Sequence, residues 1–494
     1  MSDSLKDRSI SAFLWVMIDK LGSSTINFVV TIVLARLLLP EDFGLIAMVM
    51  IFFELSASFV DSGFSNALVR EKEITKEDKS TTFVFNFFIA ILVYGILFIS
   101  APAIASFFEQ PKLVLLTRVL GINLIINACA IIQQAVLTQQ IDFKTQTKVR
   151  IPSVVISGAV AIVLALNGFG IWSLIVQMIL RAILDAILLW YFHPWKLSLT
   201  FYKESFVRLF SFGSNILIAG LVQRFFQHIF KLVIGKFFAA ATLGLYDQAN
   251  RFCNMAINHL FQAVQKISYP ILSKLQDDRQ RLKEGYKKFI KLSSFVILPA
   301  MMVLGVLAEP VIVTLIGEKW LGAVPFLKLL CLAGVTYHFH VINLNILLVL
   351  GRSDLGLKLE FIEKISIGLG IVIGIQFGIM GLVIGQVISS YINLLVNTYY
   401  SDKFLGYPLL AQLKDIFPTI AFSALMGAVL HLLAPLFDPG FLGLSILCTV
   451  GGTVYLGLHF WKKTEEYLLI QRVILPKTMG LITKLFSGRS SIRR

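Results

Sequence analysis

Charged and amide side chains recur at helical spacing inside two strongly apolar stretches of the sequence. In the first stretch the spacing i, i+3, i+4, i+7 gives one continuous helix face made of Arg224, Gln227, His228 and Lys231. In the next stretch the same spacing joins Asp247, Asn250, Arg251 and Asn254. Guanidinium and ammonium groups bind phosphate oxygens, and amides exchange hydrogen bonds with sugar hydroxyls. The pattern predicts an aqueous wall that can bind both groups.

Charges near the start of the chain extend this prediction. A charge at the centre of a lipid-facing helix costs about 2.5–3.5 kcal/mol, so such residues face water, pair or snorkel to an interface. Lys20 lies too deep in the first apolar stretch to snorkel easily, and we expect it to face the same aqueous wall. Desolvated carboxylates can exchange protons near neutral pH. The candidates for such coupling are Asp19, Glu54, Asp61 and Asp247. The alternative is that these acids only form pairs with Lys20 or Arg251.

Other charges inside apolar stretches are spaced as ion pairs. Arg181 and Asp185 are four residues apart, as are Glu360 and Lys364. Residues four apart are neighbours on a helix surface. For both pairs a structural ion pair is favoured over a ligand contact.

The elements that position these residues are membrane helices. The 494 residues are 57% hydrophobic and only 15% charged, and the mean hydropathy is +0.80. A soluble domain carries about 25% charged residues, and a β-barrel would alternate apolar and polar residues. The composition predicts an all-α integral membrane protein. About fourteen segments are long enough to span a bilayer: 11–35, 43–69, 81–107, 113–138, 151–167, 170–192, 209–235, 241–265, 292–315, 322–349, 359–376, 378–400, 416–434 and 439–461.

The basic residues indicate how these segments are oriented. The formal net charge is +15, and most of the 44 Lys and Arg residues fall in the loops on the same side as the N-terminus. The positive-inside rule then places both termini in the cytoplasm. No basic domain interleaved with aromatic residues is present, so we expect membrane lipids and no nucleic acid as partners.

Signals for catalysis or metal binding are weak. The four cysteines lie far apart, and His338 and His340 fall on opposite sides of a helix. No P-loop is present. We therefore expect neither a metal nor a cofactor, and no enzymatic activity. The segment 464–486 mixes apolar residues with lysines and predicts an amphipathic helix on the inner membrane surface.

Two sequence matches indicate an internal repeat. Residues 33–37 and Gly44-Leu45 match residues 233–237 and Gly244-Leu245 at an offset of 200. Phe169-Gly170-Ile171 recurs as Phe377-Gly378-Ile379 at an offset of 208. Six spans separate the copies, so the repeat is parallel, an arrangement that builds two-lobed transporters.

Several motifs resemble Wzx-type polysaccharide flippases, a polysaccharide transporter family of the MOP superfamily, and are most similar to its colanic acid exporter (WzxC) branch. The motifs are Leu34-Ala35-Arg36, Pro40 to Gly44, Asp61 to Phe64, Gly244 to Asp247, Ala249 to Arg251, Tyr269-Pro270, Leu275 to Asp278 and Gly317 to Trp320. The resemblance covers nearly the whole chain. It implies two six-helix lobes around a central cavity, with two extra C-terminal helices.

The resemblance also implies domains and a function. The expected domains are lobes at 1–200 and 201–402, two further spans within 403–463, and a cytoplasmic basic tail at 464–494. The implied activity is the movement of polyprenyl-diphosphate-linked oligosaccharide across the bacterial inner membrane by alternating access, with other polysaccharide assembly proteins as partners. The product would serve exopolysaccharide or lipopolysaccharide biosynthesis. Two alternatives stay open: a cation-coupled multidrug exporter of the same superfamily, and a membrane polysaccharide polymerase or ligase.

Overall fold

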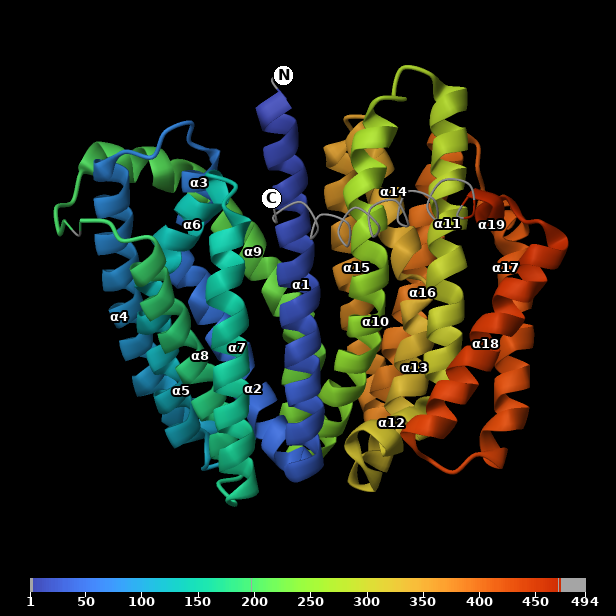
Figure 1. Ribbon diagram of the computed structural model, residues 1–494, viewed down its shortest axis with the longest axis horizontal. Helices are drawn as coiled ribbons and strands as arrows, with labels where there is room; N and C mark the ends of the chain where they lie inside the picture. Colours follow the sequence, from blue (N-terminus) through green and yellow to red (C-terminus); the bar gives the residue numbers. More distant parts are fainter. Residues whose placement is uncertain (1–2, 197, 470, 472–494) are drawn as a thin grey trace, which may run out of the picture. The chain divides into compact units, whose positions relative to one another are not determined.

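The computed structural model describes residues 3–196, 198–469 and 471, and it leaves the side chains of 3–14 and 258–267 outside the description. Throughout the described residues every regular element is a helix, as the composition predicts. The chain divides into two compact units, Met1–Asp247 and Gln248–Arg494. The elements are labelled in Figure 1.

The first unit contains nine whole helices and the start of a tenth. Their bounds are α1 (Asp3–Leu37), α2 (Pro40–Asp61), α3 (Phe64–Arg70), α4 (Lys76–Phe108), α5 (Leu113–Ala128), α6 (Ile131–Gln139), α7 (Phe143–Leu166), α8 (Ile171–Phe192), α9 (Lys203–Phe237) and α10 (Ala240–Ser273). α7 packs between α1 and α8, and α2 packs against α4, α5 and α9. The seventh expected span, α9, thus packs within this unit. The lobe boundaries expected from the sequence stay a prediction.

The second unit takes α10 onward from Gln248. Its further helices are α11 (Arg279–Val306), α12 (Ala308–Ile316), η1 (Glu318–Ala323), α13 (Val324–Gly334), α14 (Tyr337–Val349), α15 (Ser353–Gly374), η2 (Ile375–Phe377), α16 (Gly378–Leu405), α17 (Leu409–Leu433), η3 (Ala434–Leu436), α18 (Phe441–Lys462) and α19 (Glu465–Leu469). α16 packs against α13, α14 and α15, while α17 packs against α11 and α18. Only this first part of the expected amphipathic tail, α19, is described; residues from 472 onward lie outside the described part.

Among the described residues, eleven helical segments are long and apolar enough to cross a membrane, or twelve if the bent pair α5 and α6 is one span. One of the eleven, Ser353–Leu405, holds both α15 and α16, which pack against each other as two expected spans. α10 includes residues outside the search. Counting α15 and α16 as two spans raises the total among the described residues to at most thirteen, close to the expected fourteen, and the chain is a multi-pass membrane protein.

The backbone supports the parallel repeat. α1 ends at Leu37 and α2 begins at Pro40; α9 ends at Phe237 and α10 begins at Ala240, which is the same offset of 200. At the second match, Gly170 directly before α8 (φ 55°, ψ −131°) and Gly378 at the start of α16 (φ 74°, ψ −166°) adopt the same kind of backbone. A Cβ at either position would meet open space. The positive φ angle, which L side chains rarely adopt, therefore explains both glycines.

The two repeat glycines of the first match also meet within the first unit. A Cβ on Gly44 would collide with the carbonyl oxygen of Ala240, and a Cβ on Gly244 would collide with that of Pro40. The contact is reciprocal, because Gly44 and Gly244 differ by the repeat offset of 200, and so do Pro40 and Ala240. The first turns of α2 and α10 therefore cross backbone to backbone, which only glycine permits at this distance.

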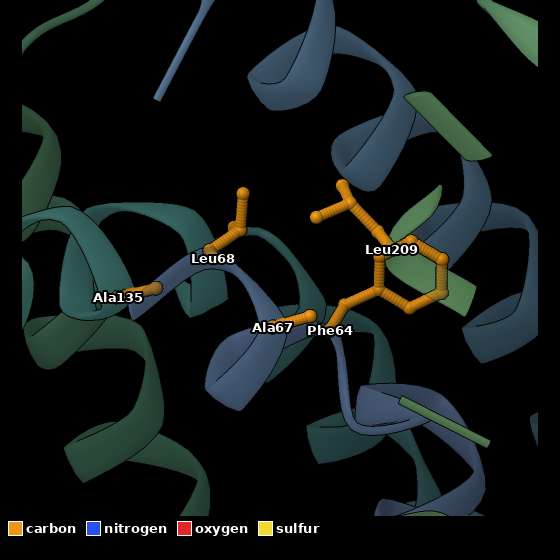
Figure 2. Packing of buried hydrophobic residues seen from close by; sticks show 5 residues of the cluster. All are labelled: Phe64, Ala67, Leu68, Ala135 and Leu209. Carbon is orange, nitrogen blue, oxygen red and sulfur yellow. The ribbon is translucent and has the colours of Figure 1, made fainter. Parts of the chain in front are cut away.

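The N-terminal part of α9 is held by a hydrophobic cluster and an ion pair. Figure 2 shows Phe64 beside Leu209, with Ala67, Leu68 and Ala135 completing the cluster formed by α3, α6 and α9. Arg208 directly precedes Leu209, and its guanidinium contacts the fully buried carboxylate of Asp78 at 2.5 Å and that of Glu71 at 3.3 Å. These contacts fix the start of the helix that carries the polar face.

Candidate functional site

The polar face of α9 meets a carboxylate of α2. Glu54 Oε2 lies 2.8 Å from His228 Nε2 and 3.8 Å from Arg224 Nη1. The His228 side chain is buried, whereas 44% of the Arg224 side chain stays exposed. Arg224 and His228 are one helical turn apart, so a single acid can contact both. The arrangement leaves guanidinium donors of Arg224 open to a ligand while one edge faces Glu54.

Lys231 lies one turn further along the same face and contacts a different acid. Its Nζ is 2.6 Å from Asp247 Oδ1, and the Asp247 side chain is almost completely buried. Only 18% of the Lys231 side chain is exposed. A buried charge is costly unless it is paired, so this contact stabilises the junction of α9 and α10. Lys231 is thus less accessible to a ligand than Arg224 is.

The remaining predicted polar residues are mostly at the surface of their own unit. Gln227 on α9 is exposed, as are Arg251 and Asn254 on α10. Asn254 Nδ2 donates to Asn250 Oδ1 at 3.0 Å, which confirms that these two amides share one helix face. Exposed amides of this kind can bind hydroxyl groups.

Asp19 and Lys20 are adjacent on α1, but their side chains lie in different surroundings. Asp19 is buried, and Arg150 Nη1 on α7 donates to its Oδ2 at 2.7 Å. Lys20 is exposed. The same unit contains the predicted pair Arg181 and Asp185 at 3.9 Å, and Arg181 also approaches Asn27 Oδ1 at 3.5 Å. Asp19 therefore forms an ion pair between α1 and α7, whereas Lys20 lies at the surface of its unit.

Asp61 has a clear local role at the end of α2. Its Oδ1 accepts hydrogen bonds from the backbone N–H of Ser65 at 3.2 Å and from the Ser65 hydroxyl at 2.5 Å. The carboxylate thereby satisfies a donor in the first turn of α3, as an N-terminal cap does. This role needs no proton exchange.

Sequence reasoning missed one cluster in the second unit. His340 Nε2 on α14 lies 3.4 Å from Glu363 Oε2 on α15, and Lys364 Nζ contacts Glu360 at 3.3 Å and Glu363 at 3.8 Å. One ligand atom from each of His340, Glu360 and Glu363 lies within 4.8 Å of the others, close enough to hold a cation. The Lys364 ammonium contacts both acids and offsets one of their two negative charges. The predicted separation of the two histidines is confirmed, since His338 instead contacts Ser294 of α11 at 2.8 Å.

Comparison with known proteins relates the chain to polysaccharide assembly. A family model described as "Polysaccharide biosynthesis protein" matches residues 33–325. The teichuronic acid biosynthesis protein TuaB of Bacillus subtilis is 29% identical over 298 residues, 60% of this chain and 62% of TuaB. The lipopolysaccharide biosynthesis protein WzxC of Escherichia coli is 23% identical, with coverage of 74% and 76%. The chain thus spans about three-fifths of the length of TuaB.

Solved structures show the same fold. The lipid II flippase MurJ in an inward closed conformation matches with a TM-score of 0.73 at 18% identity, over 91% of this chain and 99% of MurJ. An inward-facing multidrug resistance MATE family transporter of the MOP superfamily matches with a TM-score of 0.63 at 17% identity, over 80% and 98%. Both likenesses show the two-lobed transporter fold that the repeat predicts. The family model covers more than half of the chain, and the chain therefore belongs to the polysaccharide biosynthesis protein family.

Proposed function

We propose that this protein is a flippase that moves polyprenyl-diphosphate-linked oligosaccharide units across the bacterial inner membrane by alternating access. The units would serve exopolysaccharide or lipopolysaccharide biosynthesis. The observation that carries the proposal is the exposed Arg224 guanidinium on the polar face of the membrane-spanning helix α9, where Glu54 contacts both Arg224 and His228. A diphosphate is the part of such a substrate that needs this group, because arginine binds phosphate oxygens through two parallel hydrogen bonds.

Glu54 links the binding of a substrate phosphate at Arg224 to the uptake of a proton. A substrate phosphate that reaches Arg224 competes with the Glu54 carboxylate, whose contact with Arg224 is the longer one at 3.8 Å. Glu54 then keeps its 2.8 Å contact with His228 and becomes the acid that can take up a proton. Asp19 and Asp247 are paired with Arg150 and Lys231, and Asp61 caps α3. Among the four candidate acids, Glu54 is therefore our choice for coupling to a proton gradient.

The other predicted residues take supporting roles in this proposal. Lys20 and Arg251 add positive charge for the diphosphate, and Gln227, Asn250 and Asn254 bind sugar hydroxyls. Lys231 acts through Asp247 rather than by direct contact. The names of the relatives support the substrate class: TuaB is a teichuronic acid biosynthesis protein, WzxC a lipopolysaccharide biosynthesis protein, and MurJ a lipid II flippase. The polyprenyl chain has no polar group to satisfy and can remain in lipid.

One observation favours the second candidate, a cation-coupled drug exporter. The acids Glu360 and Glu363 lie together with His340, and the MATE family transporter shares the fold. However, Lys364 offsets half of the negative charge of that cluster, and the exposed Arg224 makes the face of α9 basic, which disfavours cationic drugs. The flippase remains the better supported function.

The test uses the purified full-length protein in sealed vesicles. A fluorescent oligosaccharide on a polyprenyl diphosphate is placed in both leaflets, and quenching from outside measures how much crosses. We expect the protein to accelerate crossing of this lipid and to leave a lipophilic cationic dye unmoved. Transport of the dye without movement of the lipid would favour the drug exporter. Growth of the glycan chain would indicate a polymerase.

A further inference from the structure

An open groove lies on the paired helices α17 and α18 of the second unit. It is lined by Leu413, Lys414, Phe417, Pro418, Ile420 and Lys462. Figure 1 shows α17 and α18 side by side. Both are membrane-spanning segments, and Phe417 is 64% exposed, so the groove faces the lipid phase.

The local sequence explains the groove. Pro418 lies inside α17, where it lacks the N–H that would bond to the carbonyl of Lys414, and its ring crowds that carbonyl. A proline at such a position bends a helix. The apolar side chains of Leu413, Phe417 and Ile420 line the groove around it.

Two lysines lie at the same end of the groove. Lys462 is the last residue of α18, and Lys414 lies five residues into α17, about 7.5 Å along the helix. Because the helices are joined as a hairpin, both ammonium groups lie near one membrane interface. Lys462 Nζ lies 5.9 Å from the Phe422 ring, so its stem runs along apolar surface, as snorkelling lysines do.

Nearby acids do not neutralise the groove. Asp415 accepts a hydrogen bond from Tyr407 at 2.7 Å and contacts Lys287 at 3.4 Å. Glu465 contacts Lys291 at 3.0 Å. Among the described residues, Asp415 and Glu465 thus contact other lysines. A ligand in the groove would therefore meet the positive charges of Lys414 and Lys462.

We propose that this groove is a binding site for an anionic glycerophospholipid, whose headgroup phosphate contacts Lys414 and Lys462 and whose acyl chain lies along Leu413, Phe417 and Ile420. Basic pockets between membrane helices bind such headgroups, and lysine binds phosphate as a point charge. The C-terminal residues of this chain are a poorer fit, because residues 472–494 carry six lysines and arginines and no acid that would complement the groove. The bound lipid stabilises the α17–α18 hairpin.

The experiment places a photo-crosslinking side chain, p-benzoylphenylalanine, at Phe417 of the full-length protein. The protein is reconstituted in vesicles of phosphatidylethanolamine with a minority of phosphatidylglycerol and irradiated, and the adducts are identified by mass. We expect phosphatidylglycerol adducts well above its share of the vesicle lipid. In the double variant Lys414→Gln/Lys462→Gln this enrichment should fall roughly tenfold.

A matched double variant, Lys358→Gln/Lys403→Gln, removes the same charge from exposed lysines of α15 and α16 that do not line the groove. It should leave the enrichment unchanged. Adducts to residues 472–494, or lipid adducts that only follow the vesicle composition, would overturn the proposal. An equal loss of enrichment in both double variants would also overturn it.

Discussion

At the scale of residues, the central feature is one acid of α2 that contacts two bases on the membrane helix α9. Glu54 reaches His228 and Arg224 from α2. Two roles compete for Arg224: binding the substrate, or holding α9 to α2 as a structural ion pair. The two roles differ in what removal of Arg224 does to the protein itself.

We predict that Arg224→Ala leaves the amount of folded protein in the membrane unchanged, because Glu54 keeps its contact with the buried His228. A structural ion pair predicts the opposite result. Arg224→Ala would lower the protein level, because it leaves the Glu54 charge without its partner. Adding Glu54→Ala would then restore the level. Quantitative blots of membranes and the Tm of the solubilised protein distinguish the two.

Glu54 itself should carry the response to a proton gradient. We expect Glu54→Gln to flip lipid-linked oligosaccharide at similar rates with or without a gradient, because the amide cannot bind and release a proton. The matched control is Asp61→Asn, which weakens the cap of α3 but leaves the α9 face intact. A gradient response that survives in Glu54→Gln would exclude this acid.

At the scale of elements, the backbone crossing of α2 and α10 has a direct test. Gly44→Ala forces a Cβ into the Ala240 carbonyl, and overpacking typically costs about 1–3 kcal/mol. We expect Tm to fall by roughly 2–10 °C. The control is Gly95→Ala in α4, where a Cβ meets open space. An unchanged Tm for Gly44→Ala would show that the crossing does not hold these helices together.

Contacts within one helix could be predicted from the sequence, and contacts between helices could not. The pairs Arg181–Asp185 and Glu360–Lys364 are confirmed at 3.9 and 3.3 Å, because i, i+4 spacing fixes their proximity. Glu54 and Arg224 are far apart in the chain, and only helix packing brings them together. His340 and Glu363 lie on different helices, α14 and α15, so their contact also depends on helix packing and the sequence does not indicate it.

At the scale of the whole molecule, the distribution of basic residues predicts the orientation in the membrane. Single cysteines introduced at residues 36–42, 108–112, 236–240 and 435–438 should react with an impermeant reagent from outside intact cells. Cysteines at 70–80 and 270–285 should react only after permeabilisation. Labelling of 270–285 from outside would contradict the positive-inside assignment and the number of preceding spans.

The flippase proposal rests most directly on Arg224, and one measurement tests it. The rate at which a polyprenyl-diphosphate oligosaccharide crosses proteoliposomes is compared for the wild type, Arg224→Ala, Arg224→Lys and the control Arg118→Ala. This control removes a half-buried arginine of α5 that is stacked on Phe98. Losing a charge-assisted hydrogen bond costs about 1.5–3 kcal/mol, or roughly ten- to more than a hundredfold in affinity.

We expect Arg224→Ala to slow crossing at limiting substrate by at least roughly tenfold, Arg224→Lys to recover only part of the rate because the fork of donors is lost, and Arg118→Ala to match the wild type. Crossing by well-folded Arg224→Ala at the wild-type rate would contradict the proposed role of the α9 face in binding the diphosphate.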